Sequence, residues 1–211
     1  MKLESPKIPS ELPERKFHDI FYEDYPELDK CQISDTDFEN EALHRVNLSA
    51  MVIRNCRFNG TDFTSISLTD VQFENCDFSN ANLSKSSIHR TSFNNCKFTG
   101  TDLTDSRFGN VLFEESILNL SAFGSSKLEK VLFQHASMES ADFYECILKK
   151  VEFGRCNLNS VNFERSPLKT VDISSSTFES LILSLEDLKG CKVSTQQAIQ
   201  FAALLGLKIV D

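Results

Sequence analysis

The chain of 211 residues lacks any run of about 18 apolar residues, which is the length that a membrane-spanning helix requires. The N-terminal stretch MKLESPKIPSELPERKF also lacks the apolar segment of a secretory signal. Both absences lead us to expect a protein without a membrane partner. We therefore predict that the protein is cytoplasmic.

The chain also lacks an excess of positive charge, since 31 acidic residues face 22 basic ones and the net charge is −9. This balance argues against direct binding to nucleic acid, although an acidic protein could compete for something that binds nucleic acid. The seven cysteines are an odd number and form no CxxC or Cys/His zinc spacing. With no phosphate-binding glycine motif and no histidine beside a nucleophile, we expect no enzyme activity, no cofactor and no metal.

What the sequence does contain is a pentapeptide period. Every fifth position from Leu28 to Leu188 is Leu, Ile, Phe or Met, and 15 of the 18 phenylalanines fall there. The position two earlier is mostly Cys, Val, Ala, Ser or Thr, and it holds all seven cysteines. Neither a helix nor a flat strand keeps every fifth residue on one face. We therefore predict that each pentapeptide forms a short extended side followed by a polar corner.

A longer period, equal to four pentapeptides, indicates how the sides close into a coil. Valine recurs at the small inward position in this longer period, at residues 71, 111, 131, 151 and 171. Cys56, Cys76 and Cys96 repeat with the same spacing. Four pentapeptides therefore make one coil, and residues 31–190 make eight. At strand spacing these coils would stack into a rod of roughly 40 Å, so the expected fold is an all-β solenoid.

The two ends depart from the period and are expected to cap the rod. Residues 1–30 are off-register and are expected to form an arm or cap that places their aromatic residues on the first coil. In residues 191–211, Ser194 and Gln197 form a capping box before an apolar helix that ends near Gly206. This helix could simply plug the last coil, or it could bury its surplus apolar residues in a homodimer, which we favour. The interface residues would be Ile199, Phe201, Leu204, Leu205, Leu207 and Ile209.

The motifs ANLSK at residue 81 and ADFYE at residue 141 resemble those of the pentapeptide-repeat proteins. That resemblance implies a right-handed quadrilateral β-helix. The C-terminal helix, Leu-Gly turn and hydrophobic tail are similar to those of the Qnr/MfpA quinolone-resistance family, in its loopless form because no loop interrupts the repeat. Members dimerise through this end and bind DNA gyrase, and often topoisomerase IV, as mimics of duplex DNA. The resemblance thus implies fluoroquinolone resistance; the alternative is a scaffold that binds another protein.

Sorting the outward residues by their position in the coil separates charge among four walls. We name them wall A (the side of Phe73), wall B (Phe78), wall C (Leu83) and wall D (Ile88). Walls A, B and C are mainly acidic, whereas wall D is basic, chiefly in its C-terminal half. We expect the partner to contact the acids of walls A and C, namely Glu74, Glu114, Glu115, Glu152, Asp172, Asp62, Asp102, Asp105 and Asp142. Outward Leu112, Ile117, Leu120 and Leu132 form either a second binding patch or corner packing.

Overall fold

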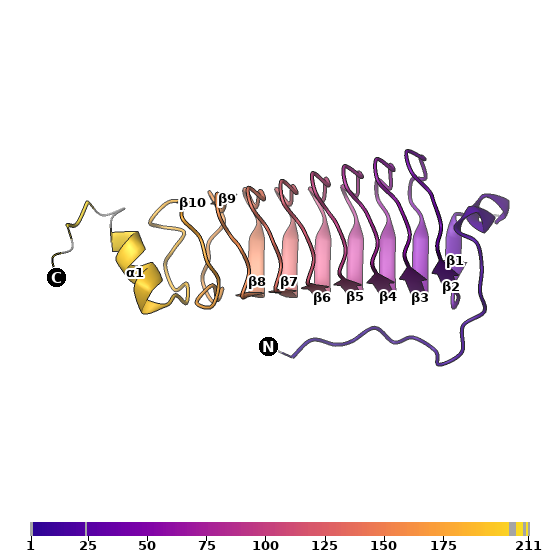
Figure 1. Ribbon diagram of the computed structural model, residues 1–211, viewed down its shortest axis with the longest axis horizontal. Helices are drawn as coiled ribbons and strands as arrows, with labels where there is room; N and C mark the ends of the chain where they lie inside the picture. Colours follow the sequence, from indigo (N-terminus) through magenta and orange to yellow (C-terminus); the bar gives the residue numbers. More distant parts are fainter. Residues whose placement is uncertain (1, 24, 203–205, 209, 211) are drawn as a thin grey trace.

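The computed structural model describes residues 2–23, 25–202, 206–208 and 210. The chain winds into a long rod of stacked coils, with a 3-10 helix at one end and an α-helix at the other (Figure 1). The elements are η1 (Phe17–Tyr22), β1 (Glu27–Asp29), β2 (Gln32–Ser34), β3 (Asn47–Arg54), β4 (Ser67–Glu74), β5 (Ser87–Asn94), β6 (Arg107–Glu114), β7 (Lys127–Gln134), β8 (Ile147–Gly154), β9 (Val161–Asn162), β10 (Leu181–Ile182) and α1 (Thr195–Ala202). The predicted right-handed quadrilateral β-helix of about eight coils is confirmed.

Each coil repeats the backbone path of the coil before it, one turn for every four pentapeptides. Strands β3 to β8 pair in parallel in order, for example Phe73 with Phe93, and each strand runs along wall D and then wall A. Walls B and C are joined by single bridges, such as Asp77 with Lys97 and Asp62 with Asn82. The backbone ladder is therefore continuous on two walls and limited to one bridge per side on the other two.

The corners of the coil explain the polar end of each pentapeptide. Every fifth residue from Lys30 to Thr170 has a positive φ, between +45° and +74°. This region disfavours most L-residues, and Asn, Asp and Gly tolerate it best. Each corner is held by a hydrogen bond to the next coil, as when the Asn75 amide donates to the Asn94 carbonyl at 3.0 Å. Asn, Asp, Ser and Gly are frequent at these corners because the backbone must turn there.

The large inward residues form columns along the axis. On wall A the rings of Phe73, Phe93, Phe113, Phe133 and Phe153 stack with centroids 4.9–5.0 Å apart. This is the separation of neighbouring strands, so one ring fits on each rung. Adjacent columns meet edge to face, the arrangement that aromatic quadrupoles favour.

The small inward position has its own chemistry. Its hydroxyls donate to a backbone carbonyl of the preceding coil, as Thr61 does to Phe38 and Thr101 does to Phe78. The buried Ser and Thr side chains are therefore satisfied. Larger residues such as Met51 and Ile66 are also buried at this position, so it is mostly, but not strictly, occupied by small side chains.

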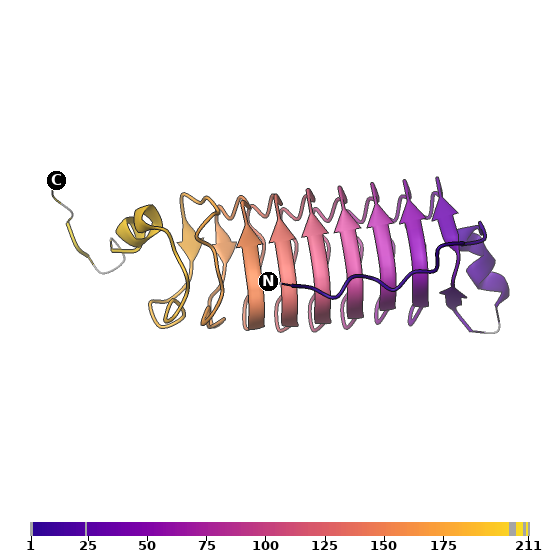
Figure 2. The same ribbon diagram turned by 90° about the horizontal axis from the view of Figure 1, so that it is seen from below.

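The N-terminal residues form both a cap and an arm. Phe17 of η1 is fully buried and packs against Phe38, Phe58 and Phe63 of the first coils. Tyr22 and Tyr25, also expected on the coil, are instead exposed. Residues 2–13 run back along the rod as an extended arm over the outside of the strands (Figure 2).

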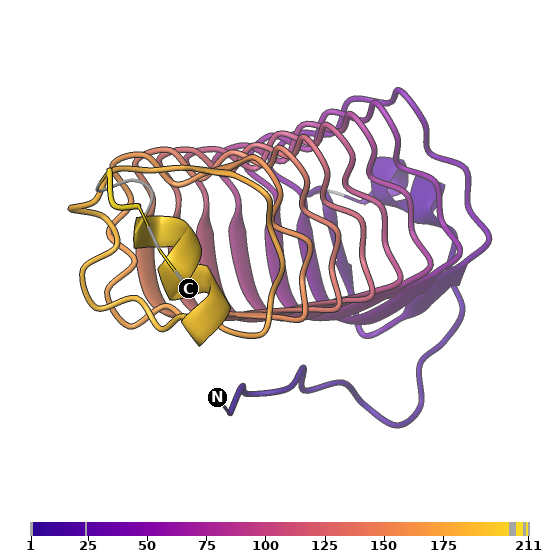
Figure 3. The same cartoon turned by 60° about the vertical axis from the view of Figure 1, so that its left-hand side comes forward.

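Helix α1 lies across the open end of the last coil (Figure 3). The predicted capping box is present: the Ser194 amide donates to Gln197 Oε1 at 2.8 Å, and the Gln197 amide donates to Ser194 Oγ at 3.2 Å. The side-chain amide of Gln197 also donates to the carbonyls of Ile173 and Ser176. The buried side chain of Gln197 therefore both caps the start of the helix and fixes the helix to the last coil by hydrogen bonds.

The final coil is less regular than the period suggests. Positions 175, 180 and 185 do not have the positive φ of earlier corners, although Asp172 still pairs with Lys192 on the next turn. Leu181 and Glu186 stand at its small inward positions, where Leu181 is only half-buried and Glu186 is exposed. Among the described residues, no helix is long and apolar enough to cross a membrane.

Candidate functional site

The register confirms how the acidic residues are grouped, because each wall is a set of straight columns. On wall C, bridges join Asp62, Asn82, Asp102, Ala122 and Asp142 in succession. The three aspartates therefore lie in one column with an acid at every second coil, roughly 10 Å apart. Asp105 lies on the same wall at an exposed corner.

The wall C aspartates also hold the turns that follow them. Asp102 Oδ1 accepts hydrogen bonds from the Thr104 amide at 2.9 Å and the Thr104 hydroxyl at 2.7 Å, and Asp62 does the same with Thr64. The Thr64 hydroxyl holds the pKa of Asp62 below its usual value. Asn82 accepts from the Ser84 amide in the same way, so the site needs an acceptor oxygen and not a charge.

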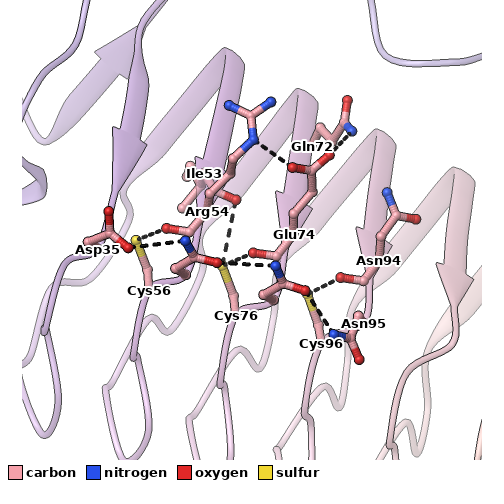
Figure 4. Close-up of polar contacts among 12 residues, drawn as sticks. Asp35, Ile53, Arg54, Cys56, Gln72, Glu74, Cys76, Asn94, Asn95 and Cys96 are labelled. Carbon is pink, nitrogen blue, oxygen red and sulfur yellow. Dashed lines mark hydrogen bonds and ion pairs between the residues drawn. The ribbon is translucent and has the colours of Figure 1, made fainter.

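Wall A brings its acids into more varied surroundings. Arg54 Nε donates to Glu74 Oε2 at 2.6 Å, and the Gln72 side-chain amide donates to the same carboxylate at 2.7 Å (Figure 4). Glu152 pairs in register with Asp172, and Asp172 also lies 3.8 Å from Lys192. Glu74 is thus partly neutralised.

The N-terminal arm covers part of wall A, which the sequence pattern did not predict. The Lys7 amide donates to Asp70 Oδ1 at 2.9 Å, and the Glu4 amide donates to Asn110 Oδ1 at 3.2 Å. Residues 3–6 share a hollow of about 250 Å³ with Leu112 and Glu114. Glu114 therefore lies beside the arm, whereas Glu115 stands at an exposed corner.

The outward leucines and isoleucine do not form one patch. Leu112 and Leu132 lie on wall A, and Leu112 lines the hollow beneath the arm. Ile117 and Leu120 lie on wall B and are 39% and 63% exposed. Leu112 therefore fits the expectation of a packed side chain, whereas Leu120, which is mostly exposed, does not.

Six of the seven cysteines are buried inside the coils, and Cys191 is half-buried. Cys56, Cys76 and Cys96 form one column below the Arg54–Glu74 contact (Figure 4). Burial raises the pKa of Cys146 to about 12 and that of Cys156 to about 11, so these thiols stay protonated near neutral pH. The described residues contain no cluster of three or more His, Cys, Asp or Glu side chains suited to a metal.

The predicted dimer residues lie at the C-terminal end, as far as the structure describes them. Ile199 is 50% exposed, Leu207 is 59% exposed, and Phe201 packs on Phe178 with ring centroids 5.4 Å apart. Leu204, Leu205 and Ile209 lie outside the described residues. Exposed Ile182 and Leu185 of the last coil enlarge the apolar surface and were not predicted.

Two features were missed by the sequence interpretation. The turn-holding role of the aspartates has a signal in the pattern Asp-x-Thr or Asp-x-Ser at residues 62, 102 and 172. The position of the arm has no comparable signal, because its contacts join residues 63 and 106 positions apart.

Two family models match the chain, both describing pentapeptide repeats. The "Pentapeptide repeats (8 copies)" model matches residues 31–70 and 42–80, and the "Pentapeptide repeat region" model matches residues 66–137 and 86–163. Together they span residues 31 to 163, more than half of the chain. No curated protein matches the sequence.

Solved structures agree on the fold. HetL, a pentapeptide repeat protein involved in heterocyst differentiation regulation from the cyanobacterium Nostoc sp. strain PCC 7120, is 15% identical, with 79% of this chain and 91% of HetL covered and a TM-score of 0.52. QnrB1, a plasmid-mediated fluoroquinolone resistance protein, is 20% identical, with 85% and 90% covered and a TM-score of 0.48. Likeness at this level of identity extends to the fold alone. The matches of the two family models show that the chain belongs to the pentapeptide-repeat family.

Proposed function

We propose that this protein binds DNA gyrase as a mimic of duplex DNA, with topoisomerase IV as a second target, and thereby confers fluoroquinolone resistance. The observation that carries the proposal is the sorting of charge by wall: acids line walls A and C in columns along the rod, and bases gather on wall D. A protein saddle that grips phosphates would accept an acidic wall and repel the basic one.

The magnitude of the charge requires this sorting. A net charge of −9 over roughly 40 Å is about one charge per 4 Å, whereas duplex DNA carries about one per 1.7 Å. The rod as a whole is thus less than half as charged as DNA along its length. Only a wall on which acids clearly outnumber bases can approach the potential of a phosphate backbone.

Wall C is the better docking wall in this structure. The arm lies over part of wall A, and Glu74 is paired with Arg54. On wall C the Asp62, Asp102 and Asp142 column is not covered by the arm, and each carboxylate retains an oxygen beyond the one that holds its turn. The exposed apolar C-terminal end supports a dimer, which would join two rods into a longer mimic.

The test is a gyrase supercoiling assay with the purified protein, with and without ciprofloxacin. Matched variants reverse one exposed charge on each of three walls: Asp105→Lys on wall C, Glu115→Lys on wall A and Glu129→Lys on wall D. Lysine already stands at the corner positions 85, 130 and 150, so the corners at 105 and 115 accept it. We expect Asp105→Lys to raise the concentration needed for gyrase inhibition about tenfold, and Glu129→Lys to leave it unchanged.

Other outcomes separate the alternatives. A larger loss with Glu115→Lys than with Asp105→Lys would move the docking surface to wall A. The proposal of DNA mimicry is wrong if the wild-type protein, at micromolar concentration, neither inhibits gyrase nor reduces the inhibition of gyrase by ciprofloxacin. The scaffold function would then be favoured.

A further inference from the structure

Wall D is hollowed where it crosses strands β5 to β8, at a distance from the acidic columns. The first hollow has a volume of about 410 Å³ and the second about 480 Å³, and Glu129 borders both. The basic side chains around the first are Arg107, Lys127 and Lys130, and those around the second are Lys149, Lys150 and Lys169.

These cations are almost entirely without internal partners. Among the described residues, only Lys130 of the six has an ion pair, with Glu4 of the arm at 3.6 Å. In a protein of net charge −9, such a group of unpaired bases on one wall stands out. It attracts anionic groups from outside the molecule.

The second hollow is apolar as well as basic. Ile147 begins β8 with its side chain 55% exposed, and Leu148, Pro167 and the stems of the lysines complete the lining. A ligand that fits this hollow must therefore bring an apolar group to Ile147 and negative charge to the lysines around it.

The chain's own arm shows how such a ligand can lie on the rod. Leu3 is half-buried, and beside it Glu4 contacts Lys130 while its backbone amide donates to Asn110. The backbone of this segment is extended along the rod (Figure 2), and it carries an apolar residue directly before a carboxylate that pairs with Lys130. The arm reaches β7 through the Glu4–Lys130 contact, and no described residue of the arm lines the second hollow over β8.

We propose that the second hollow of wall D binds an extended segment of a partner protein in which an apolar side chain is flanked by carboxylates. The apolar side chain packs on Ile147 and Pro167, and the carboxylates pair with Lys149, Lys150 and Lys169. This binding is independent of gyrase binding, since it uses the opposite charge on a different wall.

The surface fits an acidic peptide better than it fits nucleic acid. A phosphate backbone has no apolar side chain to cover Ile147, and the carboxylate of Glu129 would repel it between the two hollows. A peptide can place an uncharged residue opposite Glu129.

Fluorescence polarisation with a labelled peptide tests the proposal on the full-length protein. The probe is Gly-Glu-Asp-Leu-Asp-Glu-Gly, compared with a peptide in which alanine replaces leucine and with a short DNA duplex. We expect Lys149→Glu with Lys169→Glu to raise the Kd of the leucine peptide at least about tenfold, because two attractions become repulsions. Ile147→Ser should raise it about fivefold and should abolish the preference for leucine over alanine.

The matched control is Lys85→Glu with Lys97→Glu, the same change at exposed lysines of walls C and B. It should leave the Kd within about twofold of that of the wild-type protein. The proposal is overturned if the control weakens binding as much as the wall D variant, or if the alanine peptide binds as tightly as the leucine peptide. It is also overturned if the leucine peptide does not bind, or if the duplex alone binds.

Discussion

An aspartate that directly precedes a large inward residue of wall C, such as Asp102, has one role in the fold and a second in the proposed binding. Its Oδ1 accepts from the amide two positions later, and asparagine at position 82 performs the same function. Asp and Asn both serve at this position because both side chains offer the acceptor oxygen, although Ala122 shows that the turn can also form without it. Charge at such a position is therefore additional to what the turn requires.

This separation leads to a prediction at Asp102. Asp102→Ala removes the acceptor for Thr104 and should lower the free energy of unfolding by about 1–2 kcal/mol. Asp102→Asn keeps the acceptor and should change it by less than about 0.5 kcal/mol. Urea unfolding measures both. If Asp102→Asn also weakens gyrase inhibition, the charge itself contributes to docking; equal destabilisation by the two variants would contradict the turn-holding role.

At the scale of single elements, α1 closes the rod and leaves apolar surface uncovered. Gln197 bonds the last coil from the inner side of the helix, while Ile199 is 50% exposed. Exposed Ile182, Leu185 and Leu207 lie at the same end of the chain. A second copy of this end, related by a two-fold axis, would bury all of them.

We expect Ile199→Glu with Leu207→Glu to convert a dimer of the wild-type protein into a monomer. The physical reason is that each substitution places a charge in a surface that dimerisation would dehydrate. Sedimentation velocity at micromolar concentration gives the mass of each species. Leu120→Glu, at an equally exposed leucine in the middle of the rod, should have no effect on mass. A monomeric wild-type protein would refute the dimer.

At the scale of the whole molecule, the stacked rings need a lid at each end. Phe17 covers the first coil and is 0% exposed, whereas Phe21 stacks on Phe38 yet remains 50% exposed. A solenoid whose terminal coil is uncovered exposes apolar surface and unpaired strand edges. Phe17 therefore protects the entire column behind it.

Phe17→Ala should lower the free energy of unfolding by about 3–5 kcal/mol, which is typical of a buried aromatic residue. Phe21→Ala is the control and should cost clearly less, because half of its ring already faces water. Urea unfolding followed by circular dichroism compares the two. Equal losses, or no loss with Phe17→Ala, would show that the cap does not protect the coils.

The coils were predictable because one short rule is repeated. Phe73, Phe93 and Phe113 face inward for the same reason, and the spaced recurrence of valine and cysteine placed every residue on its wall. An N-terminal arm or cap was expected, but its path was not predictable, since Lys7 and Glu4 reach Asp70 and Asn110 through single contacts between distant residues. The last coil keeps the apolar period, so nothing in the sequence indicated that positions 175, 180 and 185 would lack the positive φ of the earlier corners.

The one-to-one pairing between successive rungs also constrains how such a chain can change in length. Gain or loss of a full rung would lengthen or shorten the rod while every later side chain stayed on its original wall. Loss of a single pentapeptide would preserve the inward period but rotate everything after it by a quarter turn, so that the lysines of wall D would arrive among the acids of an adjoining wall. Natural length variants that retain binding should therefore differ by whole rungs, that is, by complete coils of four pentapeptides.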